Sequence, residues 1–313
     1  MQRTFFYPLV MLVTAMFIMA PFSALYADVW VVSSGDTVYN LNAKGIAYPN
    51  VIPGLTQVQA AEVDPKRGIV WISVSAANTV FRYDPADKSQ NAFKSIPNIN
   101  RPGAISINPS DGAVWVAGVD SVKKISADGN QILATITGVH EPNVAVNTAD
   151  ASCWVTDSRG KVARYDASGN LVVSSPVTLK EPKYVTVNPK TGNVWVADSQ
   201  ANILVKLNSS GQELKRITDL QLPTSPRINP KDGSLWVVAS SNTLVKLSAD
   251  GQKILEVPAG MAILGICVDP TDGGVWVADQ FGSSFQGGVS KFSATGQKLF
   301  ESFIPLPSHV SAY

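Results

Sequence analysis

The chain has 313 residues, of which 45% are hydrophobic and 16% are charged. Lysine and arginine number 25 and aspartate and glutamate number 24, so the formal net charge at pH 7 is +1. A nucleic-acid-binding protein normally carries an excess of basic residues, and this near balance therefore argues against a nucleic-acid partner. A chain of this length buries about three quarters of its unfolded surface, which is enough for stability without disulfides.

Residues 1–27 have the layout of a secretory signal peptide. They contain one charge, Arg3, then an apolar run over 5–20, and the small residues Ala24 and Ala27 precede Asp28. Cleavage near Ala27 leaves a formally neutral chain that we expect to act in the periplasm or outside the cell, with no transmembrane segment. The alternative is an uncleaved anchor, although a membrane span needs about 20 apolar residues.

The rest of the chain, residues 28–313, is an internal repeat marked by tryptophan. All seven tryptophans take part and recur about every 40 residues, without helical periodicity, which is typical of a radial all-β array. They are Trp30, Trp71, Trp115, Trp154, Trp195, Trp236 and Trp276.

Each repeat divides into four short strands, named a to d in chain order. In the repeat of Trp195 they cover 185–187, 194–197, 203–207 and 213–217. Runs of β-branched and aromatic residues between turn residues are typical of strands. Strands a and b are joined by turns of the form Asn/Asp-Pro-x-x-Gly, in which proline sets φ and glycine takes the left-handed conformation. Strands c and d are joined by turns that also end in glycine.

The count of strands predicts how the ring closes. Strands b, c and d occur seven times, but strand a with its turn occurs six times, because the first repeat begins directly with strand b at 29–31. The missing strand a stands at the C-terminus, where 306–311 matches 181–186. We therefore predict one all-β domain over 28–313, a seven-bladed β-propeller of four-stranded antiparallel blades whose C-terminal strand completes the first blade.

The repeat also resembles a known family. The pattern Val-Trp-Val-Ala-Asp, then Asn-x-Ile/Val/Leu-x-Lys-Leu/Phe and a Gly-closed turn, resembles NHL-type repeats and the related streptogramin-lyase-like propellers over the whole of 28–313. Such propellers serve as enzymes, sensors and binding scaffolds, so the resemblance implies the fold rather than one function. It would also imply a histidine, a carboxylate and a divalent metal for lyase chemistry. His140 and His309 are the only histidines and are expected on opposite sides of the ring, so these roles are not carried over.

Cys153 and Cys267 lie in different repeats, too far apart for a disulfide, whose Cα atoms must lie within about 7 Å. Each stands where other repeats have a small or apolar residue. We expect both to be packed in the structure rather than catalytic or metal-binding.

Hairpin geometry puts the a–b and c–d turns on one face and the b–c and d–a connections on the other. Because the second face varies and binding residues usually lie on variable loops, we predict a site there, around the central channel. The b–c loop of the last repeat is the longest and includes Gln280, Phe281, Phe285 and Gln286. We interpret it as a recognition loop, with a disordered insertion as the alternative.

Two charged residues, Glu62 and Arg227, interrupt strand a where other repeats have Ser, Thr, Ala or Cys. Strand a is innermost, so these charges must reach channel water or find a partner, and we predict that they contact a ligand. His140 and His309 complete the set of candidate ligand contacts.

Asp157, Asp198 and Asp279 stand at the third position after their tryptophans. Carboxylates that meet at a channel mouth could bind Ca²⁺ or Mg²⁺. The alternative is that each caps the following turn through backbone hydrogen bonds. No other cofactor is expected.

These observations predict an extracytoplasmic binding protein whose variable face engages a protein, peptide or glycan. One alternative is a metal-dependent hydrolase or lyase, of the lactonase or streptogramin-lyase kind, with acidic channel ligands such as Glu62, Asp157, Asp198 and, as an amide ligand, Asn143. A second alternative is an extracytoplasmic sensory domain. The sequence contains neither a GxSxG serine motif nor a Gly-rich phosphate loop.

Overall fold

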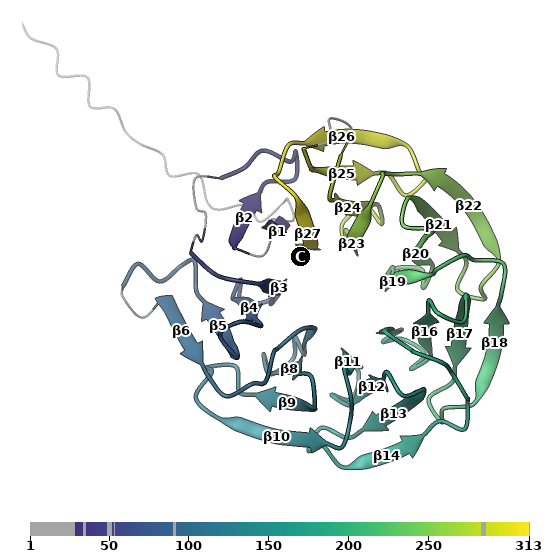
Figure 1. Cartoon of the computed structure of the whole chain (residues 1–313), viewed down its shortest axis with the longest axis horizontal. Coiled ribbons are helices and arrows are strands. Elements are labelled where there is room, and N and C mark those ends of the chain that lie inside the picture. The colour runs from purple at the N-terminus through teal and green to yellow at the C-terminus, as the bar shows by residue number, and fades with distance from the viewer. Residues whose placement is uncertain are drawn as a thin grey trace, which may run out of the picture.

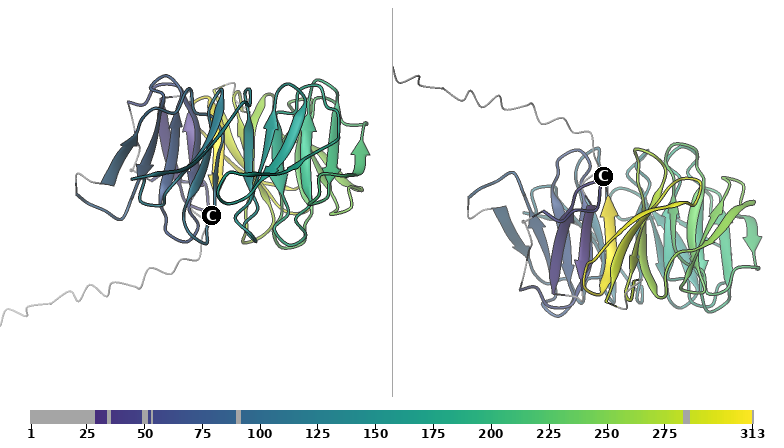
Figure 2. Two further views of the ribbon diagram at one scale, coloured as in Figure 1. Left: turned by 90° about the horizontal axis from the view of Figure 1, so that it is seen from below. Right: turned by 90° about the horizontal axis from the view of Figure 1, so that it is seen from above.

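The computed structural model describes residues 29–33, 36–48, 52, 54–89, 92–282 and 286–312. They form 27 strands in seven antiparallel sheets, arranged as blades around a central channel (Figure 1). Seen from the side, the blades form a flat disc (Figure 2). The predicted signal peptide lies outside the described residues. Among those that are described, no helix has the length and apolar character to cross a membrane.

Six blades contain four consecutive strands in the order a to d, from the channel outward. Blade 2 has β3 (Val58–Val63), β4 (Val70–Val74), β5 (Thr79–Tyr83) and β6 (Phe93–Ile96); blade 3 has β7 (Ile105–Ile107), β8 (Val114–Ala117), β9 (Ser121–Ile125) and β10 (Ile132–Thr137); blade 4 has β11 (Asn143–Val146), β12 (Cys153–Asp157), β13 (Lys161–Tyr165) and β14 (Leu171–Ser174). Blade 5 has β15 (Tyr184–Val187), β16 (Val194–Asp198), β17 (Ile203–Leu207) and β18 (Glu213–Ile217); blade 6 has β19 (Thr224–Ile228), β20 (Leu235–Ala239), β21 (Thr243–Leu247) and β22 (Lys253–Pro258); blade 7 has β23 (Ile263–Val268), β24 (Val275–Asp279), β25 (Gly288–Phe292) and β26 (Lys298–Ser302).

Blade 1 joins the two ends of the chain. Its sheet has the order β2-β1-β27, with β1 (Val29–Ser33) and β2 (Thr37–Leu41) from the N-terminal part and β27 (Pro307–Ala312) from the C-terminal part. In the outermost position two isolated bridges, Leu41–Ala47 and Val38–Ile52, stand in place of a continuous strand. The predicted closure of the ring by a C-terminal innermost strand is confirmed.

The tryptophans pack between blades. Seven buried apolar clusters fill the seven interfaces between neighbouring blades, and each contains the tryptophan of one blade against aliphatic residues of the next. Trp195 of blade 5, for example, packs with Leu235 and Val237 of blade 6. None of the seven indoles is more than 2% exposed. Because a buried aromatic contributes a large apolar area, these contacts fix the spacing of the blades.

The glycine-closed turns have the predicted geometry. Gly192 ends an a–b turn with φ of 71°, and its N–H donates to the Asn188 carbonyl at 2.8 Å. Gly211 ends a c–d turn with φ of 77°, where an added Cβ would lie 2.8 Å from Val173 Cγ1 of the neighbouring blade. Here a larger residue would be strained and would also push on the neighbouring blade.

Both cysteines are free and buried, as predicted. Burial raises the pKa of the Cys153 and Cys267 thiols far above the usual value, which keeps them neutral and unreactive at ordinary pH.

Candidate functional site

The innermost strands enclose a channel whose main cavity has a volume of about 1060 Å³. In every blade, one residue of strand a pairs with the tryptophan of strand b. These seven residues stand at the same level of the channel and form a ring. The seven residues of this ring are Glu62, Ser106, Ala145, Thr186, Arg227, Cys267 and Ser311. Glu62 and Arg227 are its two charged members, and both line the cavity as predicted.

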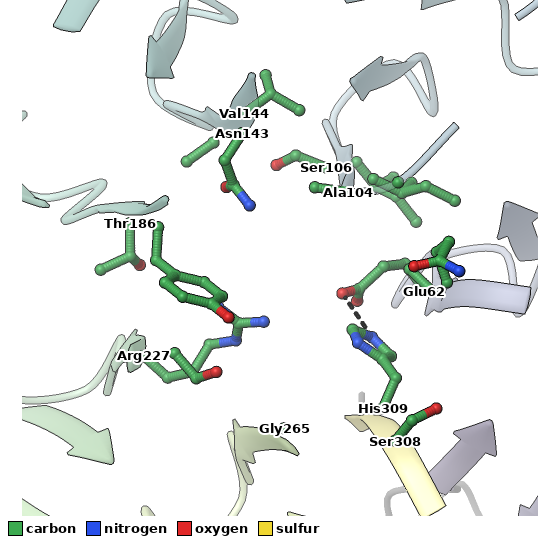
Figure 3. Close-up of a pocket in the computed structure, with 18 of the residues that line it drawn as sticks. Glu62, Ala104, Ser106, Asn143, Val144, Thr186, Arg227, Gly265, Ser308 and His309 are labelled. Carbon is green, nitrogen blue, oxygen red and sulfur yellow. Dashed lines mark hydrogen bonds and ion pairs between the residues drawn. The ribbon is translucent and has the colours of Figure 1, made fainter. Parts of the chain in front are cut away.

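Glu62 is held by the C-terminal strand of the neighbouring blade 1. Its Oε1 lies 3.1 Å from His309 Nε2 (Figure 3). Its Oε2 accepts a hydrogen bond from Ser311 Oγ at 2.8 Å. Burial alone would raise the pKa of this carboxyl. The hydrogen bonds with His309 and Ser311 and the nearby charge of Arg227 outweigh burial and lower the pKa below its ordinary value of 4.5. Glu62 is therefore an anion at neutral pH.

Arg227 lies across the channel from this pair (Figure 3). Within the described part of the chain its guanidinium makes one hydrogen bond, from Nη1 to the carbonyl of the adjacent Pro226 at 3.3 Å. Among the described residues no carboxylate lies within 4.0 Å of it, so this partly buried cation has no ion-pair partner. A guanidinium offers five N–H donors in a planar fork that matches a carboxylate or phosphate.

Polar side chains continue toward the b–c and d–a face. Two positions earlier on strand a than the ring residue of the same blade stand Asn143, Tyr184 and His309. All three line the cavity together with Ser225 and Ser308. Tyr184, Ser225 and Ser308 were not predicted. The sequence does contain a signal for Tyr184. Side chains two residues apart on a strand lie on the same face of the sheet, so Tyr184 lies on the same face as Thr186.

The long loop of blade 7 reaches the mouth of this channel. Gln280 lines the cavity, whereas Phe281 is 41% exposed and Gln286 is also exposed at the surface. The Gln286 carbonyl accepts a hydrogen bond from the N–H of Leu306 at 3.5 Å, which connects the loop with the d–a connection into blade 1. Phe285 lies outside the described residues, so its predicted role is not addressed.

Large apolar side chains are exposed at this mouth and in the segments of blade 7 next to it. Leu264 and Leu306 line the cavity while 46% and 41% exposed, and Met261 and Phe281 are 51% and 41% exposed. The last two flank Asp279, whose carboxylate accepts from both of their N–H groups. Exposed apolar side chains that gather at an opening are typical of a binding surface.

The three candidate metal-binding aspartates are buried in three different blades and occupied by hydrogen bonds. Asp198 and Asp279 each accept from backbone N–H groups of the preceding d–a connection, at 2.6–3.0 Å. Asp157 forms an ion pair with Arg159 at 2.6 Å. These contacts are those of turn caps, and a shared cation would have to displace them.

His140 stands apart from the channel. It is exposed, does not line the cavity, and places Nδ1 2.9 Å from Ser158 Oγ. The structure therefore brings together Glu62, His309 and Arg227 of the predicted set, but not His140.

The channel offers a poor donor set for a resident divalent cation. Within the described residues no group of three or more His, Cys, Asp or Glu side chains comes together. Glu62 is already bonded by His309 and Ser311. The site thus holds one histidine and one carboxylate, which are bonded to each other, and among the described residues it offers no third ligand of these types for the metal that the resemblance would imply.

Neither a protein-family model nor a curated protein matches the chain. Solved structures do. A functionally unknown protein from Desulfotomaculum acetoxidans DSM 771 has a TM-score of 0.76 and 13% identity, covering 91% of this chain and 98% of that one. A streptogramin B lyase has a TM-score of 0.67 and 15% identity, covering 81% and 86%. At these identities the likeness concerns the fold, and the chain is a seven-bladed β-propeller that shares its fold with streptogramin B lyase.

Proposed function

We propose that this protein is a binding protein whose central channel holds the anionic end of a ligand at Arg227. The observation that carries the proposal is a partly buried guanidinium without an ion-pair partner among the described residues, in a cavity of about 1060 Å³. A carboxylate or phosphate would complete it with charge-assisted hydrogen bonds, which are about twice as strong as neutral ones.

The rest of the cavity supports a polar ligand. Glu62 is anionic and can accept a hydrogen bond from a ligand hydroxyl or ammonium, while Asn143 and Tyr184 offer both donors and acceptors. A concave site with few charged groups at fixed positions is typical of small-molecule and chain-end recognition.

The exposed apolar rim of Leu264 and Leu306, with Phe281 exposed next to the cavity-lining Gln280, supports entry from the b–c and d–a face, where the body of a protein, peptide or glycan ligand would rest. The signal-peptide pattern of 1–27 supports an extracytoplasmic location. Fractionation of the producing cells tests this location, and recovery of the chain from the cytoplasm alone would contradict it. Sequencing the N-terminus tests cleavage near Ala27.

Calorimetric titration with N-acetylglycine, galacturonate and inorganic phosphate tests the channel proposal. We expect at least one anion to bind, and R227Q to weaken that binding about tenfold or more, as expected for lost hydrogen bonds to a charged group. R227K retains the charge but not the planar fork of N–H donors, so its affinity for the anion should lie between those of wild type and R227Q. R216Q is the matched control, because Arg216 pairs with Glu213 on the outer strand β18. Equal binding by R227Q and wild type, or no binding of any of the three, would refute the proposal.

The contact between His309 and Glu62 favours a second candidate, an acid–base hydrolase. If Nε2–H donates to the Glu62 carboxylate, Nδ1 is left as a base, and it makes no hydrogen bond with a described residue. That nitrogen could take a proton from water as the water oxygen bonds to an ester carbonyl, then return it to the departing alkoxide. Turnover of lactones or cyclic esters that is lost in H309Q would support this candidate; absence of turnover over such a panel would remove it.

A further inference from the structure

A second cavity adjoins the Arg227 level on the side of the a–b turns. It has a volume of about 350 Å³ and shares Glu62 and Arg227 with the main cavity. Its wall is mainly aliphatic. Several blades each contribute the last residue of strand a and the proline of the a–b turn that follows. Its members include Val187, Ile228, Val268, Pro189, Pro230 and Pro270. We call it the turn-side cavity.

The two sides of Arg227 thus differ in polarity. Toward the b–c and d–a face the wall carries Asn143, Tyr184, Ser225, Ser308 and Gln280. A hydrocarbon chain there would leave these groups without partners, whereas peptide amides could hydrogen-bond with them, so the main cavity favours a polypeptide over an alkyl chain.

The length of the main cavity is suited to a few residues of extended chain. Leu264 on the rim is three residues before Cys267, which stands at the level of Arg227. At about 3.3 Å per residue of strand, this corresponds to about 10 Å, or three residues of an extended peptide. A peptide whose carboxylate reaches Arg227 would therefore have its fourth residue from the end near Leu264 and Leu306.

We propose that the channel binds the free C-terminus of a polypeptide whose last residue is apolar. The terminal carboxylate contacts Arg227, the last side chain enters the turn-side cavity, and the preceding amides face the polar wall. This inference rests on the proposed function and adds the ligand class to it.

The test uses N-acetylated hexapeptides of alternating glycine and serine with Gly, Ala, Val or Leu at the last position. We expect the peptide acid ending in Leu to bind at least about tenfold more tightly than the one ending in Gly, because burying a leucine side chain is worth that much or more. The corresponding C-terminal amide should bind at least about tenfold more weakly than the acid. R227Q should abolish this difference between acid and amide.

Two substitutions in the turn-side cavity test the placement of the last side chain. V268T replaces a methyl group by a hydroxyl at nearly constant volume, I228T adds a hydroxyl on a smaller side chain, and both positions are only partly buried. Each should reduce the advantage of Leu over Gly while leaving the Gly peptide unchanged. V172T is the matched control, because Val172 is 52% exposed on the outer strand β14. Urea unfolding of each variant checks that it is folded.

The outcomes separate the two proposals. Arg227-dependent binding of N-acetylglycine or galacturonate without any preference for the Leu peptide would overturn this inference and leave the proposed function standing. Equal binding of acid and amide would also overturn it. If L264A, rather than V268T or I228T, removed the preference for Leu, the last side chain would lie at the rim and the proposed orientation would be wrong.

Discussion

At the scale of single residues, the channel is organised by three side chains from three blades, Glu62, Arg227 and His309. The anion of Glu62 is stabilised by contacts that only the closed ring can provide, since His309 and Ser311 come from the other end of the chain. The site therefore exists only when the last strand is in place.

Acid titration should reveal the Glu62 contacts. The folded-state pKa of Glu62 lies below 4.5, so its contribution to stability is fully present above about pH 4.5 and is lost as pH falls through the folded value. We expect E62Q to be less stable than wild type by about 1.5–3 kcal/mol at pH 7, the usual range for hydrogen bonds to a charged group. The difference should shrink as pH falls below 4.5. Urea unfolding of both proteins between pH 3.5 and 7 measures it, and a difference that grows in acid would contradict the account.

The charged members of the channel ring could be predicted from the sequence, because Glu62 and Arg227 replace small residues at a position fixed by tryptophan. The contact between Glu62 and His309 could not, since the sequence predicts neighbouring strands but not the direction in which each side chain turns. The role of Phe285 in the long loop stays a prediction.

At the scale of strands, a cation on strand c links most blades to the next. The side chain that pairs with the tryptophan donates to a carbonyl in the c–d turn of the following blade, as in Lys206 to Ala249 at 2.8 Å. Five blades share this contact, through Arg82, Lys124, Arg164, Lys206 and Lys246. The three lysines among them also lie over the indole of the tryptophan in their own blade.

Removing one such link should destabilise the ring moderately. K246M keeps much of the apolar stem but loses the hydrogen bond to the Ala294 carbonyl and the contact with Trp236. We expect a loss of about 1–3 kcal/mol in the free energy of unfolding, measured with urea. K215M is the control, because Lys215 makes a similar bond from an outer strand but has no indole contact. An equal loss in the two variants would contradict a role for the indole contact.

Blade 7 uses its lysine differently. Lys291 is 3% exposed and bonds within its own blade, to Asp269 at 2.5 Å and to Asp272 at 3.2 Å. Four other blades have Asn at the position of Asp269, so D269N can keep the turn bonds to Thr271, but it puts an NH2 group where Lys291 and Trp276 now donate. We expect D269N to cost about 3–5 kcal/mol, since it leaves the buried Lys291 with only the half-exposed Asp272 as a partner.

The matched control for D269N is D272N. The Asp272 side chain is 50% exposed, so its ion pair with Lys291 should contribute only a fraction of a kcal/mol. Thermal and urea unfolding of both variants provide the comparison. Similar stabilities of D269N and D272N would show that burial of the Lys291 pair does not matter as described.

At the scale of the whole molecule, we expect blade 1 to separate from its neighbours more easily than the other blades, although Glu62 of blade 2 is bonded to His309 and Ser311. Lys291 on one side of it is bound within blade 7, and Asn40 stands at the corresponding position of blade 1 with its carbonyl oxygen buried and without a hydrogen-bond partner among the described residues. Neither interface of this blade therefore has the cation link that the other five interfaces share.

Hydrogen exchange should show whether blade 1 opens before the other blades. We expect the amides of β1 and β27 to exchange before those of β16 and β20, although all four are internal or channel strands. Mass-spectrometric exchange on the intact protein measures the order. Simultaneous protection of blades 1, 5 and 6 would mean that the missing links have no effect on opening.

The fold could be predicted almost completely from the sequence, because the tryptophan period, the turn chemistry and the count of strand a each depend on local residues. The state of Arg227 is harder to predict. The sequence places Arg227 of β19 in the channel, but it does not show that no carboxylate of the described residues lies within 4.0 Å of the guanidinium. Packing of seven blades around one axis creates the channel, and no single repeat contains it.

The most direct measurement is an NMR titration that follows the arginine side-chain Nε–H resonances as N-acetylglycine is added, with R227K used to assign the signal of Arg227. The account predicts that this resonance shifts and saturates with the dissociation constant found by calorimetry, while that of Arg216 on the outer strand β18 stays in place. A saturating shift at Arg216 with none at Arg227 would contradict the claim that the channel binds anions.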